Sequence, residues 1–414
     1  MSSLPATTAA LPATFRRLAW SNLAAQSAEQ VGLAAAPIVA VLALGAGAAE
    51  TGLLQTAQTL PFLLLAIPAG LLADRRSRRA LMVLAETLRA ASLAAVVLCV
   101  AGHVLSLPLL AMLGFIGAAG TVAYSVAAPS LIPALVPRAQ LSLANGRIEL
   151  ARTVAFAAGP AVAGALVGWT GALPAFTVAA LLSAGAALLL AGLAEPPRPV
   201  RPPRHPLHDL REGAGFTFRH RLLRPVLLTQ VIFNIGLFVL QAVFVPWAVH
   251  RLGLSAAGTG SVLAFYGLGM VAGALLSQHV LRQLPFGIVV SIGPVAGFVA
   301  ALMMMATIWL PSPVLAGLGF FLIGAGPILW VISTTTLRQT VAPQDMLGRV
   351  SALFLMAQGG RPVGAAIGAA VGALWGMEAC LIIAAVIFAL QALVILLSPL
   401  LRLAALPDAL PAAA

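Results

Sequence analysis

Long apolar segments occur along the whole chain and limit the folds that it can adopt. An α-helix of about 20 residues crosses about 30 Å of hydrocarbon, the thickness of a bilayer core. A soluble domain could not use so many apolar residues, 61% of this chain, because it needs a polar surface. The runs are continuous, whereas β-barrel strands alternate apolar and polar residues. Cutting the chain at charges, Pro/Gly clusters and polar breaks predicts an all-α membrane protein with twelve transmembrane helices, at 18–44, 50–73, 80–101, 105–134, 149–168, 173–194, 225–249, 257–280, 285–309, 312–337, 350–373 and 376–398.

The arginines predict how these segments are oriented. With the N-terminus in the cytoplasm, 19 of the 23 basic residues, all arginine, fall in cytoplasmic segments, and Arg251 is the one in an outside loop. Arg89, Arg152 and Arg361 lie within spans. Cytoplasmic loops of membrane proteins carry such an excess of basic residues. We therefore expect a multi-pass protein of the cell (inner) membrane with both termini cytoplasmic. The net charge of +12 is spread over loops, so nucleic acid is not an expected partner.

The one long polar connection divides the segments into two sets of six. The stretch HDLREGAGFTFRH within it predicts a short surface helix, after a stretch rich in proline and arginine. The expected organisation is an N-terminal tail, a first six-helix bundle, a cytoplasmic linker, a second six-helix bundle and a C-terminal tail, at 1–17, 18–194, 195–224, 225–398 and 399–414.

A short internal repeat supports two equivalent halves. In each half a Gly-Arg pair is followed, thirteen residues after the arginine, by a proline near mid-span: Gly146, Arg147 and Pro160, then Gly348, Arg349 and Pro362. Chance matches are frequent in so biased a sequence, so the repeat is moderate support by itself. With six-plus-six segments it favours pseudo-symmetric bundles that rock around a central site, as in secondary transporters.

Glu29 is a carboxylate near the middle of segment 18–44. At that depth an ionised carboxylate costs about 2–3 kcal/mol or more. Asn22, Gln26 and Gln30 recur with it at helical spacing and share one face, which we expect to line a water-filled cavity. One interpretation is that Glu29 binds and releases a coupling proton. The alternative is a structural glutamate held by an ion pair or hydrogen bonds.

Arg361 is the complementary charge, about twelve residues into segment 350–373 and so at the depth of Glu29. It either stabilises the ionised form of a cavity acid such as Glu29 or attracts an anionic substrate. The alternative is that it binds carbonyls freed by Pro362 or a nearby polar side chain. Glu86 and Arg89, three residues apart in segment 80–101, are interpreted as a structural pair.

The densest charge cluster is GLLADRRSRR at 70–79, with four arginines in five positions. It resembles the signature between the second and third helices of the major facilitator superfamily, with Ser77 and Pro61 where that family usually has glycine. The motif positions are Gly70, Asp74, Arg75, Arg78 and Arg79.

A second stretch resembles the same family's fifth-helix motif, which accompanies its exporters and antiporters. Gly159, Pro160 and Gly164 match it, while Ala155 and Ala163 replace glycines. Three longer stretches resemble the branch that holds enterobactin-type siderophore exporters and macrolide efflux proteins: LPFLLLAIPAGLLADRRSRR, APSLIPALVPRAQLSLANGRIELAR and GRVSALFLMAQGGRPVGA.

The resemblance implies roles for both motifs. Asp74 would cap the helix that begins near Gly348 and Arg349, latching the two halves in one conformation, with a stabilisation of about 0.3–1 kcal/mol. The alternative for the arginines is that they only fix topology and meet anionic lipid headgroups. Pro160 would introduce a kink that seals the halves against proton and substrate leak, or would serve ordinary helix packing.

In the family's fold the first, fourth, seventh and tenth helices line the cavity. Amides and aromatic side chains on apolar walls suit a fairly large amphipathic solute better than a sugar. Each is as consistent with helix–helix contacts. Besides Asn22, Gln26 and Gln30, the candidate cavity residues are Gln58, Tyr124, Gln230, Asn234, Trp330 and Gln358.

The expected function is a proton-coupled antiporter that exports hydrophobic or amphipathic small molecules such as drugs, by alternating access and as a monomer. The alternatives are a siderophore or natural-product exporter and a lysolipid flippase of the same fold. The sequence has no nucleotide-binding, zinc-protease or serine-hydrolase motif, so an enzyme, a metal and a cofactor are not expected. The expected partners are the small-molecule substrate, protons and membrane lipids.

Overall fold

The computed structural model describes residues 11–137, 140–195, 206–343 and 346–406, and this part of the chain is helical, without a β-strand. The helices are α1 (Ala13–Leu44), α2 (Ala48–Leu64), α3 (Ala66–Arg75), α4 (Arg78–Ala101), α5 (Leu107–Leu135), α6 (Leu141–Thr170), α7 (Ala172–Ala191), α8 (Pro206–Arg219), α9 (Leu223–His250), α10 (Ala256–Gln283), α11 (Phe286–Ala306), α12 (Pro313–Val341), α13 (Leu347–Met356), η2 (Ala357–Gly359), α14 (Gly360–Leu396) and η3 (Pro399–Arg402).

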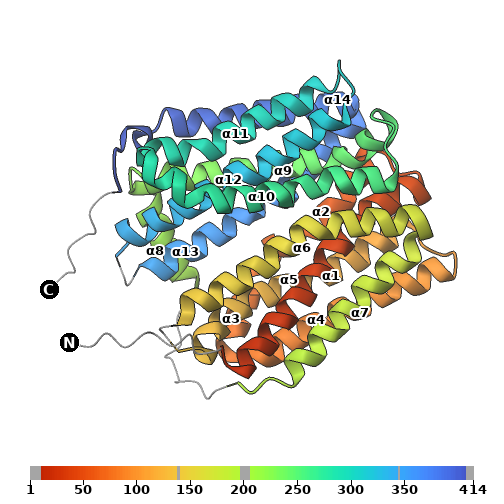
Figure 1. Cartoon of the computed structure of the whole chain (residues 1–414), viewed down its shortest axis with the longest axis horizontal. Coiled ribbons are helices and arrows are strands. Elements are labelled where there is room, and N and C mark those ends of the chain that lie inside the picture. The colour runs from red at the N-terminus through yellow and green to blue at the C-terminus, as the bar shows by residue number, and fades with distance from the viewer. Residues whose placement is uncertain (1–10, 138–139, 196–205, 344–345, 407–414) are drawn as a thin grey trace.

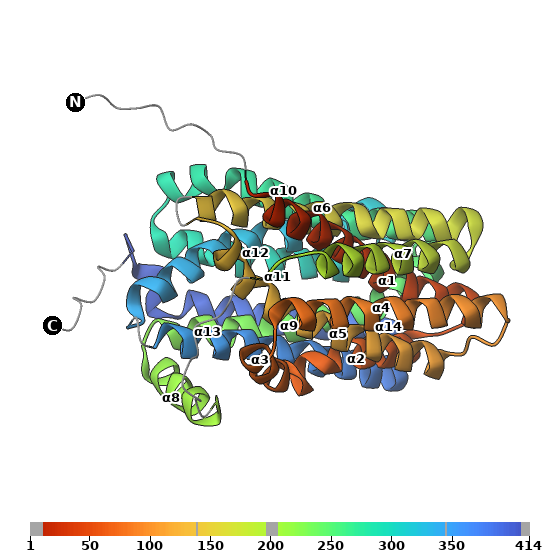
Figure 2. The ribbon, with the colours of Figure 1, turned by 90° about the horizontal axis from the view of Figure 1, so that it is seen from below.

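The helices form two groups, α1–α7 and α9–α14, that lie side by side (Figure 1). In the first group α1 packs on α6 and α7, while α4 packs on α5 and α7. In the second, α14 packs on α9, and α12 packs on α10 and α11. Figure 2, turned by 90°, shows the first residues of α1 and the end of the described chain after η3 on the same side of the molecule as α8 and α13. We call that side the terminal end and the opposite side the far end.

Ten helices of the described residues are long and apolar enough to cross a membrane. The predicted segment 50–73 is not among them, because its helix is broken at Leu65 into α2 and α3. The last candidate, Leu347–Leu396, is 50 residues long and contains a non-helical residue at Gly376. The all-α membrane fold is confirmed, whereas the count of twelve spans stays a prediction. The linker stretch HDLREGAGFTFRH lies largely within α8, so a helix there is confirmed.

Two glycines join the fifth and sixth segments of each half in the same way. Gly171, between α6 and α7, has φ 85° and ψ −173°, and Gly376, inside α14, has φ 83° and ψ −178°. This backbone conformation is essentially confined to glycine. The helices of both pairs therefore reverse direction at a single residue, a second structural match between the halves besides the Gly-Arg and proline repeat.

Replacing Gly376 by alanine is expected to lower the free energy of unfolding by about 1–3 kcal/mol, because alanine is strained in this conformation. Thermal unfolding of the purified protein in detergent measures the change. Gly185→Ala in α7 is the control, since a Cβ there meets no atom within 4 Å. An equal melting temperature for both variants would contradict the strain argument.

The two groups meet backbone to backbone from the far end to about the middle of the helices. A Cβ on Gly267 of α10 would lie 2.2 Å from the Cα of Ala157 of α6, and one on Gly52 of α2 would lie 2.6 Å from the Cα of Ala369 of α14. Thr51 Oγ1 also donates a hydrogen bond to the carbonyl of Ala242, at 2.7 Å. Small residues thus allow close packing between the groups in this half of the molecule.

Candidate functional site

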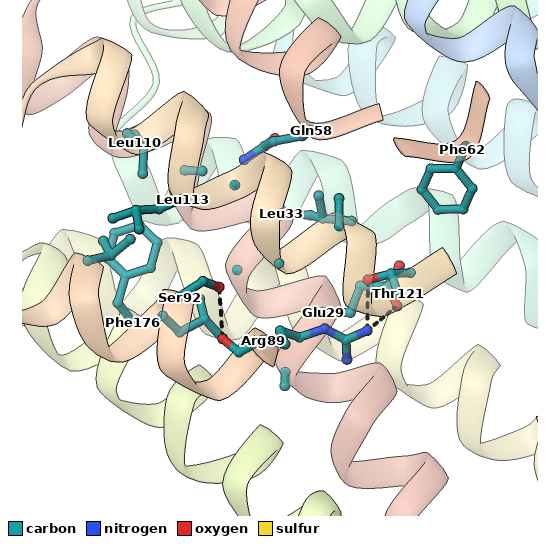
Figure 3. Close-up of a pocket in the computed structure, with 18 residues that line it drawn as sticks. Glu29, Leu33, Gln58, Phe62, Arg89, Ser92, Leu110, Leu113, Thr121 and Phe176 are labelled. Atoms are coloured by element: carbon teal, nitrogen blue, oxygen red, sulfur yellow. Dashed lines mark hydrogen bonds and ion pairs between the residues drawn. The ribbon is translucent and has the colours of Figure 1, made fainter. Parts of the chain in front are cut away.

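A pocket opens inside the first group of helices, between α1, α2, α4, α5 and α7 (Figure 3). It holds about 580 Å³ of empty space, including its open side. Most of its wall is apolar, from residues such as Leu33, Leu93, Leu110, Leu113 and Phe176. The polar groups that face it are Glu29, Gln58, Arg89, Ser92 and Thr121. Such a lining suits an apolar solute held by a few polar contacts.

Arg89 is the centre of a buried charge network at one side of this pocket. Its Nη1 lies 2.9 Å from Oε1 of Glu86 and donates a hydrogen bond to the carbonyl of Ala25 at 3.1 Å. Its Nη2 donates to Thr121 Oγ1 at 2.7 Å and lies 3.9 Å from Oε2 of Glu29. The Arg89 guanidinium therefore contacts α1, α4 and α5, and it contacts two carboxylates, Glu86 through Nη1 and Glu29 through Nη2.

The two carboxylates of this network are held differently. Glu86 has no exposed side-chain surface and accepts a 2.7 Å hydrogen bond from Ser183 Oγ of α7 besides its contact with Arg89. The Glu29 side chain is 17% exposed and has the longer contact with Arg89. Glu29 is thus the carboxylate that the pocket can reach.

This network corrects one interpretation made from the sequence. The i, i+3 pair of Glu86 and Arg89 is present, but it is not a separate structural element, because Arg89 also contacts Glu29. Spacing along one helix predicted the pair, whereas the contact with α1 depends on tertiary packing. The signal available was Arg89 itself, an arginine within a span that needs a buried anion.

Arg361 lies at the meeting of the two groups. It is the second residue of α14, after the short helix η2, so segment 350–373 is interrupted just before it. Its Nε donates to Asn234 Oδ1 at 3.2 Å, and its guanidinium lies 5.1 Å from the Phe62 ring and 5.7 Å from the Phe238 ring. It interacts electrostatically with Glu29, but the ion pair that Glu29 forms is with Arg89.

The polar residues predicted on the face of Glu29 do not all point the same way. Asn22 is buried, accepts a 3.4 Å hydrogen bond from the Tyr124 hydroxyl and donates to the carbonyl of Ile148. Gln30 is buried against α6, where a Cβ on Gly159 would lie 2.4 Å from the Gln30 Cβ. Gln26 is half-buried. The structure places only Glu29 of this set in the pocket wall described here.

The other predicted cavity residues are distributed over both groups. Gln58 lines the pocket, is buried and has an Oε1 without a hydrogen-bond partner. Gln230 Nε2 donates to the carbonyl of Phe354, and Asn234 Nδ2 donates to the carbonyl of Gln230. Trp330 is buried in the core of the second group with its Nε1 unpaired, and Gln358 is half-buried in η2.

The segment 70–79 is held by Glu195, a residue outside both family motifs. Gly70 and Asp74 belong to α3, and the side chains of Asp74 and Arg75 lie outside what the structure describes. Glu195, at the start of the linker, accepts hydrogen bonds from Ser77 Oγ and from the N–H groups of Arg78 and Arg79, the last two at 3.1 Å. A carboxylate there suits the N-terminus of α4.

The linker also contacts the second group of helices. Arg349 of α13 forms an ion pair with Glu212 of α8, with a 2.9 Å contact between Nη1 and Oε2. A Cβ on Gly213 would lie 2.8 Å from the carbonyl of Arg349, so α8 packs closely on α13. Gly348 is exposed, and a Cβ there would meet no atom within 4 Å.

The fifth-helix motif lies on two contact surfaces of α6. Gly159 packs on Gln30 of α1, within the first group. Pro160 and Gly164 pack on Gly260 of α10, across the junction between the groups: a Cβ on Gly260 would lie 2.3 Å from the Pro160 carbonyl oxygen. Within the described residues, no three His, Cys, Asp or Glu side chains come together to hold a metal ion.

Known proteins resemble this chain in sequence and in fold. The family model of the Major Facilitator Superfamily matches residues 18–362. An uncharacterized MFS-type transporter, y4rN, from Sinorhizobium fredii is 28% identical over 58% of this chain, and the match spans 59% of that relative. The multidrug efflux pump Tap from Mycobacterium tuberculosis is 25% identical over 92% of this chain and 93% of Tap.

Solved structures share the fold at low identity. A POT family transporter in complex with 5-aminolevulinic acid has a TM-score of 0.75 at 12% identity and covers 94% of this chain and 96% of its own. The nucleoside transporter NupG has a TM-score of 0.72 at 15% identity and covers 93% and 98%. These folds agree with the helical architecture, and the family that the sequence matches consists of transporters, not enzymes. The chain belongs to the major facilitator superfamily of membrane transporters.

Proposed function

We propose that this chain is a proton-coupled antiporter that exports hydrophobic or amphipathic small molecules by alternating access. It acts as a monomer in the cytoplasmic membrane with both termini in the cytoplasm. The bundles at 18–194 and 225–398 rock against each other, joined by the linker 195–224. The observation that carries the proposal is Glu29: a partly exposed carboxylate in the wall of an apolar pocket, paired at 3.9 Å with Arg89.

Proton exchange at Glu29 is supported by its surroundings. Glu86 has two tight partners, Arg89 and Ser183, whereas Glu29 has, among the described residues, a single ion pair at 3.9 Å and access to the pocket. One charge crossing 100 mV supplies about 2.3 kcal/mol. That is enough to sustain a substrate gradient of about 45-fold per proton, at about 1.4 kcal/mol per factor of ten.

The substrate class is supported by the pocket and by one relative. Apolar side chains form most of the wall, and Gln58 supplies an acceptor without a partner. An amphipathic molecule meets both kinds of surface. Tap, which shares 25% identity over nearly the whole chain, is named a multidrug efflux pump.

Alternating access is supported by the contacts between the groups of helices. They close on each other from the far end to mid-helix, through Gly267, Gly52 and Thr51. In the opposite state we propose that the far ends separate, while segment 70–79 reaches α13 near Gly348 and Asp74 replaces Glu212 as the partner of this helix end. Pro160 and Gly164 then belong to the surface that opens and closes.

Replacing Glu29 by glutamine is expected to remove proton-driven accumulation and to leave exchange of substrate for substrate intact. The amide keeps the size of the side chain but cannot carry the proton. The measurement is dye or antibiotic accumulation in inverted membrane vesicles, with an imposed pH gradient, with a protonophore, and as counterflow without a gradient. Glu378→Gln, which removes an exposed carboxylate paired with Arg251, is the matched control and is expected to behave as wild type.

The same vesicles separate this function from the alternatives. Protonophore-sensitive accumulation that persists in Glu29→Gln would exclude Glu29 as the coupling acid. Movement of lysophospholipid analogues in proteoliposomes, without transport of soluble dyes or antibiotics, would favour a lysolipid flippase. Transport confined to iron-chelating metabolites would favour a dedicated siderophore exporter.

A further inference from the structure

We propose that Arg89 is a positioning residue for Glu29. The guanidinium of Arg89 contacts both Glu86 and Glu29, and the balance between these two contacts sets the pH at which Glu29 exchanges its proton. This inference rests on the proposed function, since it assigns the residues that tune the coupling acid. Glu86 is the fixed counter-ion of the arginine in both protonation states of Glu29.

The net charge of the cluster depends on whether one of its two carboxylates carries a proton. Glu29, Glu86 and Arg89 carry one net negative charge when both acids are ionised and none when one is protonated. One proton therefore neutralises the cluster, and a buried cluster without net charge is the less costly to keep in a membrane. The protein has to determine which acid takes that proton.

The geometry assigns the proton to Glu29. Glu86 has no exposed side-chain surface, contacts Arg89 Nη1 at 2.9 Å and accepts from Ser183 at 2.7 Å. Protonating it would disturb both contacts and would require a path for the proton through packed helices. Glu29 is reached from the pocket, and its protonation weakens only a 3.9 Å contact.

Arg89 is held in place independently of Glu29. Its Nη1 bonds to the carbonyl of Ala25, one turn before Glu29 on α1, and its Nη2 bonds to Thr121 of α5. The guanidinium therefore cannot follow the Glu29 side chain as that side chain moves in the pocket. Figure 3 shows Arg89 extended between Ser92 and Thr121, with Glu29 beside its guanidinium.

Other charged or titratable groups also act on Glu29. From outside α4 they are Arg361 of α14, Arg152 of α6 and the Tyr124 hydroxyl of α5. The pocket residues of α2 and α7 carry no charge. These groups are unchanged when residues 86 and 89 are substituted, so a comparison of substitutions at these two positions isolates the contribution of the Glu86–Arg89 pair.

Substitutions of Glu86 and of Arg89 should shift the pH at which Glu29 is protonated in opposite directions. In Glu86→Gln the charge of Arg89 is balanced by Glu29 alone, so Glu29 stays ionised to lower pH. Arg89→Gln leaves two carboxylates without their cation, so Glu29 stays protonated to higher pH. Each midpoint is expected to move by about one pH unit, as is typical for one charge at this distance. The double variant removes one charge of each sign and should lie between the single variants.

The measurement is infrared titration of the purified protein in lipid vesicles, which needs no substrate. The carboxylic C=O stretch of protonated Glu29 is the titrating band that Glu29→Gln removes. Arg89→Lys, which keeps the charge but not the planar fork, should shift the midpoint upward by less than Arg89→Gln. Glu378→Gln and Arg251→Gln break an exposed ion pair and should leave the midpoint unchanged.

The outcomes separate this inference from the proposed function. A titrating Glu29 band with the same midpoint in Glu86→Gln, Arg89→Gln and the double variant would overturn the positioning role while leaving Glu29 as the coupling acid. Shifts of both single variants in the same direction would do the same. Absence of any titrating band that depends on Glu29 would contradict the proposed function itself. Because the double and lysine variants keep the cluster closer to its native charge, a failure of Arg89→Gln to fold leaves the test intact.

Discussion

Replacing Gly267 by leucine is expected to reduce transport about tenfold or more, because it prevents α6 and α10 from meeting. A Cβ at this position would lie 2.2 Å from the Cα and 2.3 Å from the nitrogen of Ala157. Both are backbone atoms and cannot turn aside as a flexible side chain could. Overpacking at such a contact costs about 1–3 kcal/mol, which lowers the population of the closed far end by about 5- to 150-fold.

Spin labels on α6 and α10 can test this directly. With Cys99 and Cys380 first replaced by alanine, cysteines are placed at the exposed positions Thr170 and Ser261. The distance between the labels should increase in Gly267→Leu, together with the loss of transport. Gly185→Leu adds the same side chain where a Cβ meets nothing within 4 Å and should match wild type in both measurements. An unchanged distance with full transport would mean that this contact does not form during the cycle.

Replacing Arg361 by glutamine is expected to abolish transport without abolishing membrane insertion. The guanidinium joins the two groups of helices: it stacks near Phe62 of α2, and it contacts Asn234 and Phe238 of α9. A desolvated cation over aromatic rings contributes about 2 kcal/mol. Glutamine can keep the bond to Asn234 but loses both ring contacts and the positive charge that acts on Glu29.

The controls for Arg361 separate charge from shape. Arg361→Lys keeps the charge without the planar group and should retain part of the transport. Arg251→Gln removes an arginine that also lies over an aromatic ring, Trp247 at 5.4 Å, but on the exposed far end, and should transport normally. Accumulation assays are compared at equal protein levels in the membrane, measured by immunoblot. Normal accumulation in Arg361→Gln would exclude any mechanistic role for this residue.

The distribution of apolar residues along the sequence predicts where this chain forms helices, because each predicted segment is a long apolar run between polar breaks. Each of the twelve segments lies mainly within helical backbone, and the linker helix α8 also lies where its sequence indicates. The interruptions were not predicted. Pro68 cannot donate to the carbonyl of Leu64, which accounts for the break between α2 and α3 at Leu65. The short helix η2 before Arg361 has the same kind of signal, because Pro362 cannot donate to the carbonyl of Gln358.

The candidate site was predictable in its charges but not in its partners. Glu29 stands out because an acid within a span needs a compensating group. Its partner could not be chosen from the sequence, since Arg89, Arg152 and Arg361 were all available and only packing brings Arg89 within 3.9 Å. Glu195 was overlooked for a similar reason: it lies more than a hundred residues from Ser77, the residue whose hydroxyl it binds.

Gly171 and Gly376 bear on how the protein enters its membrane during synthesis. Each glycine is the single residue between one long helix and the next, so no hydrophilic loop separates the two helices. If the fifth helix of a half inserted alone, the sixth would stay at the bilayer surface with its apolar side chains in water. The fifth and sixth helices of either half should therefore partition into lipid together, as one antiparallel hairpin. If translation stopped between them, neither helix would reach its final position in the membrane.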